Sequence, residues 1–171
     1  MAEGWTELET SFVEPFYLSM MAQNAPSHAH EVWSGLVEAG QHVIPRDLDE
    51  LLRAGMWRPV VMGAWFGLAL PTDETRDLLV TAMRSSSGSL TAYPLATACS
   101  IVVGADAVDA MSAYISFISD PMRDDRSGGF VAAAIEHLGG SAPVVPSDRN
   151  RQDLLEMRDV ASRLQDAFRQ P

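Results

Sequence analysis

The side chains that are best suited to bind a metal ion lie in the short segment His28-Ala29-His30-Glu31. Imidazole and carboxylate groups are good ligands for a transition metal. A helix turns by about 100° per residue, however, so side chains two positions apart point about 200° away from each other. Because two such rings cannot share one ion on a helix, we predict no metal site here.

A second candidate is the acidic cluster of Asp120, Asp124 and Asp125, interleaved with Arg123 and Arg126. A calcium loop needs a regular spacing of oxygen ligands and a distal glutamate, and this segment has neither. We therefore interpret it as a solvated turn in which acids and arginines pair with each other.

The remaining reactive residue types are isolated. Cys99 lies inside an apolar run, which is typical of a small core residue in a reducing compartment. His42 and His137 have no sequence neighbour that would orient them as a base. The chain has no glycine-rich phosphate loop, no nucleophile elbow and no paired cysteines. We predict no catalytic residue and no cofactor.

Three apolar stretches repeat at a spacing of 35 residues, at 59–70, 94–105 and 129–140. When the stretches are superimposed, small residues share one column: Gly63, Ala98 and Ala133. Such a period is typical of helical hairpins that each bury an inner helix against the next hairpin. The sequence therefore predicts one all-α domain, residues 1–171, built of stacked antiparallel helical hairpins as a short HEAT-like solenoid with a repeat core at 12–138.

The first inner helix has the clearest predicted start. Pro59 suits the first helical position, which would make Arg58 the N-cap and let Trp57 fold back on Met62 as a hydrophobic staple. The helix that follows is apolar on every side, so we expect it, with Trp65, to be buried centrally. We assign structural roles to Trp57, Arg58 and Trp65.

Because arginine is a poor N-cap residue, we expect the charged group of Arg58 to interact elsewhere in the fold. We expect either a salt bridge to a carboxylate of a neighbouring helix, such as Asp49 or Asp77, or the binding of an anion.

Other helices are predicted at 12–22, with Pro15 in the first turn, at 27–40, with Ser27 as the cap, and at 47–54. The tail, residues 147–170, is predicted to be a helix with an apolar three-then-four spacing at Leu154, Met157, Ala161, Leu164 and Phe168. This helix either caps the open end of the stack or, through residues 154–168, forms the seam of a homodimer; otherwise the chain is a monomer.

The chain is strongly acidic, with 23 acidic residues, 12 arginines and a net charge of −11. The first 50 residues hold nine acids against Arg46 alone. Nucleic acid is excluded as a partner, because phosphate binding needs a basic face, whereas a basic protein is favoured. The residues that we expect to contact such a partner are Glu31, Glu38, Asp47, Asp49 and Glu50.

Two observations indicate a cytoplasmic protein with no membrane partner. The N-terminus is acidic and unlike a secretory signal. The longest uninterrupted apolar run, residues 60–70, is far shorter than the ~20 residues that span a bilayer.

Several short motifs resemble a bacterial family of small helical proteins that carries only a domain-of-unknown-function label. The segments that carry the resemblance are residues 12–17 (FVEPFY), 51–52 (LL), 57–59 (WRP), 64–66 (AWF), 78–79 (LL), Tyr93 with 95–96 (LA), and 114–115 (YI). The resemblance covers about residues 12–138 and implies a helical-repeat fold. It implies no catalytic residue.

Two hypotheses for function follow. The first is an acidic helical-repeat module that binds a basic partner protein, in the manner of an immunity or antitoxin-like inhibitor. The alternative is a small enzyme or binding protein for an apolar metabolite, with a pocket between helices lined by some of the four tryptophans and nine methionines.

Overall fold

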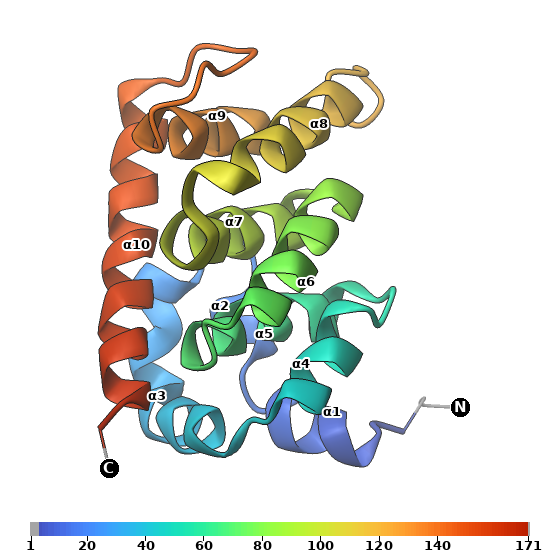
Figure 1. Cartoon of the computed structure of the whole chain (residues 1–171), viewed down its shortest axis with the longest axis vertical. Helices are drawn as coiled ribbons and strands as arrows, with labels where there is room; N and C mark the ends of the chain where they lie inside the picture. Colours follow the sequence, from blue (N-terminus) through green and yellow to red (C-terminus); the bar gives the residue numbers. More distant parts are fainter. Residues whose placement is uncertain (1–3, 171) are drawn as a thin grey trace.

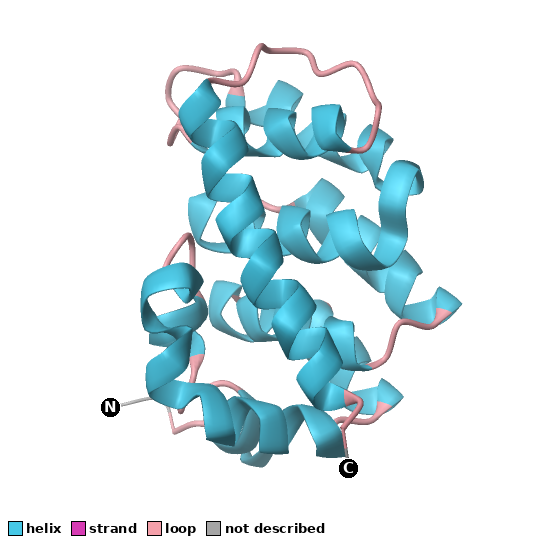
Figure 2. Cartoon of the chain, turned by 90° about the vertical axis from the view of Figure 1, so that its left-hand side faces the viewer, coloured by secondary structure: helices cyan, strands magenta, loops and turns pink. Residues whose placement is uncertain are grey.

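The computed structural model describes residues 4–170, and that range contains helices, turns and loops but no strand, so the all-α prediction is confirmed (Figures 1 and 2). The elements in chain order are α1 (Glu7–Phe12), α2 (Tyr17–Met20), α3 (Ala25–His42), α4 (Pro45–Leu52), α5 (Trp57–Phe66), the 3₁₀ turn η1 (Gly67–Ala69), α6 (Asp73–Ser85), α7 (Ser89–Ala98), the π-helical η2 (Cys99–Val103), the 3₁₀ turn η3 (Gly104–Ala107), α8 (Val108–Ile118), α9 (Ser127–His137) and α10 (Asp148–Phe168).

Consecutive helices pack as the pairs α4–α5, α6–α7 and α8–α9, which follow one another from the bottom to the top of Figure 1. One helix of each pair also contacts its counterpart in the next pair: α5 packs on α7 and α7 on α9, while α4 packs on α6 and α6 on α8. The three apolar stretches lie in α5 with η1, in α7 with η2 and the start of η3, and in α9 with the turn that follows it. The 35-residue spacing therefore corresponds to three helices that contact one another in order.

The longest helix, α10, runs along one side of the molecule, in front of the other helices in Figure 2. It packs against α3, α7, α9, η1 and η2. The prediction that it caps one open end was therefore wrong: its apolar stripe covers the sides of several helices in turn. The side chains of that stripe are buried within the chain: Leu154, Met157, Ala161, Leu164 and Phe168.

Contact between α3 and α10 depends on Gly40. A Cβ atom at this position would overlap the ring of Phe168. Gly40 is buried, and only a residue without a side chain lets the two helices approach this closely.

The N-terminal helices differ from their predicted bounds. The helix expected at 12–22 is not continuous: Phe12 ends α1, residues 13–16 form a turn that contains Pro15, and α2 follows. Proline breaks the helix here because it has no N–H and its ring clashes with the preceding turn. The next helix, α3, begins at Ala25 rather than after a Ser27 cap and carries Pro26 in its first turn. Helix α4 begins at Pro45, two residues before the predicted start.

Helix α5 begins at Trp57, with Met56 at the N-cap position. Arg58 is therefore not the cap, and Trp57 is not placed before the helix as a staple would be. Pro59 is the third helical residue. The first N–H groups of any helix lack an intrahelical acceptor, so proline is tolerated at several positions of the first turn and does not fix the start.

The segment Ser89–Ile118 is long and apolar enough, by length and composition alone, to cross a membrane. Here it is divided into α7, η2, η3 and α8, and every residue from Thr91 to Ala98 is buried in the protein core. Buried core helices commonly pass the same test. Pro94, inside α7, cannot bond to the carbonyl of Leu90, and that oxygen accepts instead from the backbone N–H of Ala22, 3.1 Å away.

Candidate functional site

The two histidines His28 and His30 lie on the exposed surface of α3. His28 Nδ1 lies 3.0 Å from Glu31 Oε1, and this hydrogen bond holds the pKa of Glu31 below its ordinary value. His30 is exposed and joins no such pair. Within residues 4–170, no three histidine, cysteine, aspartate or glutamate side chains are placed to hold a metal ion.

We predicted that the carboxylates of the acidic loop before α9 pair with the arginines of the same loop, and this prediction is wrong. Asp120 and Asp124 accept hydrogen bonds from the backbone N–H groups of Met122 and Arg126, at 3.0 and 2.9 Å. The guanidinium of Arg123 lies over the ring of Phe117, 4.4 Å from its centroid. Free backbone N–H groups in a turn compete well for nearby carboxylates, and this competition accounts for the difference.

Asp125 joins the starts of two helices. Its carboxylate accepts from the backbone N–H of Ser89, the first residue of α7, and from the N–H (3.2 Å) and hydroxyl (2.6 Å) of Ser127, the first residue of α9. Tyr114 from α8 donates to the same Ser127 hydroxyl. Burial raises the pKa of Asp125, but the hydrogen bonds from Ser127 and Ser89 outweigh burial and bring it below the ordinary value. The arrangement is a shared helix cap.

Cys99 is fully buried, and burial raises the pKa of its thiol to about 12. Its sulfur lies 3.7 Å from the carbonyl oxygen of Leu79. A thiol in this setting stays protonated and packs as a core residue, as the sequence predicts.

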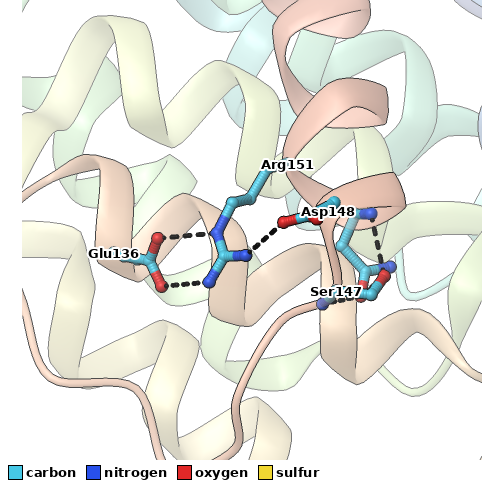
Figure 3. Close-up of polar contacts among 5 residues, drawn as sticks. Glu136, Ser147, Asp148 and Arg151 are labelled. Carbon is cyan, nitrogen blue, oxygen red and sulfur yellow. Dashed lines mark hydrogen bonds and ion pairs between the residues drawn. The ribbon is translucent and has the colours of Figure 1, made fainter.

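Charged groups between α9 and α10 are paired with each other (Figure 3). Arg151 donates to both carboxylate oxygens of Glu136, at 2.8 and 3.1 Å, and to Asp148 at 2.9 Å. These contacts lower the pKa of Glu136 and raise that of Arg151. Ser147 and Asn150 form a reciprocal cap at the start of α10. Because these groups satisfy one another, we assign the cluster to helix docking.

Arg58 makes neither of the salt bridges considered for it. Its guanidinium lies 4.8 Å from the ring centroid of Trp57, 5.3 Å from Tyr17 and 5.9 Å from Trp5. Asp49 pairs instead with Arg53, at 2.6 Å. Arg58 Nε is buried without a hydrogen-bond partner among residues 4–170. The electron-rich faces of three rings take the place of a carboxylate beside this cation.

The acids predicted to bind a partner are spread over two helices. Glu31 and Glu38 lie on α3, and Asp47, Asp49 and Glu50 on α4. Three of them form hydrogen bonds within the chain. Glu31 bonds to His28, Asp49 accepts from Arg53, and Asp47 accepts from the backbone N–H of Ile44 at 3.0 Å. Glu38 and Glu50 are exposed, and within the described chain their carboxylates make no ion pair or hydrogen bond. These two are free to meet a partner.

A groove between α1 and α4 brings some of these acids together with residues that the sequence analysis missed. It has a volume of about 430 Å³. Its acidic walls are Glu7, Asp47 and Glu50, and its apolar surface includes Ile44, which is 53% exposed. We call it the α1–α4 groove. The hydrophobic pattern of α1 gives no signal for this contact, because the two helices are more than 30 residues apart in the chain.

No family model, curated protein or solved structure matches this chain. The resemblance to a bacterial helical family therefore stays a prediction. The candidate site rests on the geometry of this chain alone.

Proposed function

We propose that this protein is a binding module for a basic partner protein, acting as an immunity or antitoxin-like inhibitor, and that the partner docks at the α1–α4 groove. The observation that carries the proposal is the combination of unpaired acids and exposed apolar surface in one hollow. Glu7 and Glu50 make no ion pair in the described chain and face the groove beside Ile44. A lysine- or arginine-rich surface with an apolar anchor would complement both features.

The charge distribution supports the same conclusion. A net charge of −11 attracts a basic protein over a distance, and the groove offers the place where the encounter becomes a specific contact. Arg46 also lines the groove, so the partner surface should present at least one carboxylate or backbone carbonyl at that point.

We also propose that the three helix pairs form a short HEAT-like solenoid. The ordered contacts of α5, α7 and α9 on one side, and of α4, α6 and α8 on the other, support this interpretation. Solenoids commonly bind partners along an extended surface, and the groove lies beside the first pair.

The test uses Glu7→Lys/Glu50→Lys as the groove variant. Purified products of the neighbouring genes are screened by isothermal titration, and association with a basic product that binds is followed by stopped flow. We expect the groove variant to associate at least about tenfold more slowly at low salt, because charge complementarity acts mainly on the encounter rate.

The matched control is Asp106→Lys/Asp109→Lys, which makes the same change in net charge at exposed positions of η3 and α8. It should slow association much less. The difference between the two variants should shrink in 1 M salt, where the Debye length falls to ~3 Å. Equal rates for the two variants would remove the α1–α4 groove from the mechanism.

A further inference from the structure

A second hollow lies between the turn that joins α4 to α5 and the end of α6. Its volume is about 370 Å³, within the range of about 300–1,000 Å³ that is usual for small-molecule sites. Leu52, Trp57 and Leu78 are among its apolar lining residues. Met56 also lines the hollow and is 54% exposed. A flexible methionine in this position can adapt to a bound apolar group.

Several hydroxyl groups also line the hollow. Thr81, Ser85 and Ser87 line the hollow, and none of their side chains makes a hydrogen bond within residues 4–170. Ser86 and Thr91 line it as well but bond to each other, at 2.7 Å. The lining therefore combines apolar side chains with three hydroxyl groups that have no partner within the described residues, and a site that orients a ligand through a few polar contacts has this combination.

The charged side chain at the hollow is basic, in contrast to the acidic chain as a whole. Among residues 4–170, no acidic side chain lines it, although the sequence has 23 acids, and its one charged lining residue is Arg53. Arg53 Nε donates to Asp49, but its two Nη groups have no partner within the described residues. A guanidinium with free N–H groups recognises a carboxylate well.

We propose that this hollow, the Arg53 pocket, binds a small carboxylate amphiphile, with its apolar chain on Leu52, Trp57 and Leu78 and its carboxylate between Arg53 and the free hydroxyls. The site is separate from the α1–α4 groove and does not depend on the proposed partner. Its ligand would be a short fatty acid or a molecule of similar chemistry.

The first experiment titrates the full chain with decanoate and with 1-decanol by isothermal titration calorimetry, while tryptophan emission reports on Trp57. We expect decanoate to bind at least about fivefold more tightly than decanol, because only decanoate can use the guanidinium. The emission change should disappear in Trp57→Phe. Absence of decanoate binding at millimolar concentration, or equal affinity for decanol, would overturn the proposal.

The second experiment blocks the pocket. Thr81 is exposed on α6, so Thr81→Phe should fold and fill the hollow, and it should weaken decanoate binding at least tenfold. Ser87→Phe, in the following loop, gives a second blocking variant. The control is Thr10→Phe, the same change at an exposed position of α1 that lines no hollow described here. Unchanged binding in both blocking variants would place the ligand elsewhere and overturn the assignment.

The third experiment isolates the charge. Arg53→Gln should weaken decanoate binding at least fivefold and leave decanol unaffected, whereas Arg84→Gln, which removes an exposed arginine of α6 that does not line the pocket, should change neither. Glu7→Lys/Glu50→Lys should bind decanoate as the wild type does, so failure of the groove proposal and failure of this one are distinguishable. Equal effects of the two arginine substitutions would contradict the role of Arg53.

Discussion

Trp65 is the side chain at the centre of the N-terminal half of the molecule. It is 1% exposed, and its indole N–H donates to the carbonyl oxygen of Met20, 2.9 Å away. Trp65→Ala should lower the free energy of unfolding by about 3 to 5 kcal/mol, because it leaves a cavity and an unpaired carbonyl. Urea denaturation gives the value. Trp33→Ala, at a half-buried position of α3, should cost clearly less, and equal losses would contradict the central position of Trp65.

Arg58 is held by aromatic rings, so its removal leaves no orphaned carboxylate. We expect Arg58→Ala to lower the free energy of unfolding by about 1 to 2 kcal/mol, from lost cation–π and packing contacts, rather than the ~3–5 kcal/mol of a broken buried ion pair. Arg58→Lys should recover only part of the loss, because an ammonium group cannot stack as a planar guanidinium does.

The anion-binding alternative for Arg58 is tested in the same denaturation experiments. Unfolding is compared in phosphate and in chloride at equal ionic strength. If Arg58 acts structurally, phosphate should shift the midpoints of the wild type and of Arg58→Ala by the same amount, because its general stabilising effect does not depend on Arg58. Stabilisation by phosphate that disappears in Arg58→Ala would show instead that the guanidinium binds an anion.

At the scale of helices, Asp125 couples the starts of α7 and α9. Its pKa is lowered in the fold, so its contribution to stability is present above the ordinary value of 3.8 and is lost as the pH falls through the lower folded value. Asp125→Asn should cost about 1 to 2 kcal/mol at pH 7 and progressively less as the pH falls below 3.8, where the wild type also loses the charge.

Urea denaturation between pH 7 and pH 2.5 measures this convergence. Asp124→Asn is the control, because Asp124 caps only its own turn, through the N–H of Arg126. It should cost less than Asp125→Asn at neutral pH. A constant difference between wild type and Asp125→Asn across this range would contradict the assigned role.

Helix positions were predictable where apolar residues determine them, and helix ends were not. The buried stretches of α5, α7 and α9 stand out in the sequence because burial on every side needs a continuous apolar run. Pro15 and Pro59 misled the prediction of helix ends, because a proline fits a turn and several first-turn positions equally well. Long-range partners decide between these options, and sequence spacing does not reveal them.

The polar contacts of η2 and of the candidate sites were unpredictable for the same reason. Arg158, in α10, donates to the carbonyl and hydroxyl of Ser100, at 2.8 and 2.7 Å, and Arg76, in α6, donates to the carbonyl of Val102 at 3.0 Å. Both arginines come from helices far from η2 in the chain. The α1–α4 groove likewise combines acids that the sequence analysis singled out, Asp47 and Glu50, with Glu7, which only the fold brings beside them.

At the scale of the whole molecule, α10 connects elements that are otherwise far apart. Leu164 is fully buried in its apolar stripe, whereas Leu155, on the same helix, is 51% exposed. Leu164→Asp should therefore cost several kcal/mol, because it places an unpaired charge in the core, and Leu155→Asp should change stability by about 0.5 kcal/mol or less. Thermal and urea denaturation of the two variants measure the difference.

The wild type and Leu164→Asp together also show whether residues 154–168 pack within one chain or form a dimer interface. If the apolar stripe of α10 packs entirely within one chain, the protein should sediment as a monomer of 18.6 kDa. Its thermal midpoint should then not depend on protein concentration. In a dimer held by this stripe, the midpoint of the wild type would rise with concentration, and Leu164→Asp would yield a folded monomer. We expect Leu164→Asp instead to be a monomer, as the wild type is, with its stability lowered by several kcal/mol, because a charge in the stripe weakens the packing of α10 on α3, α7 and α9.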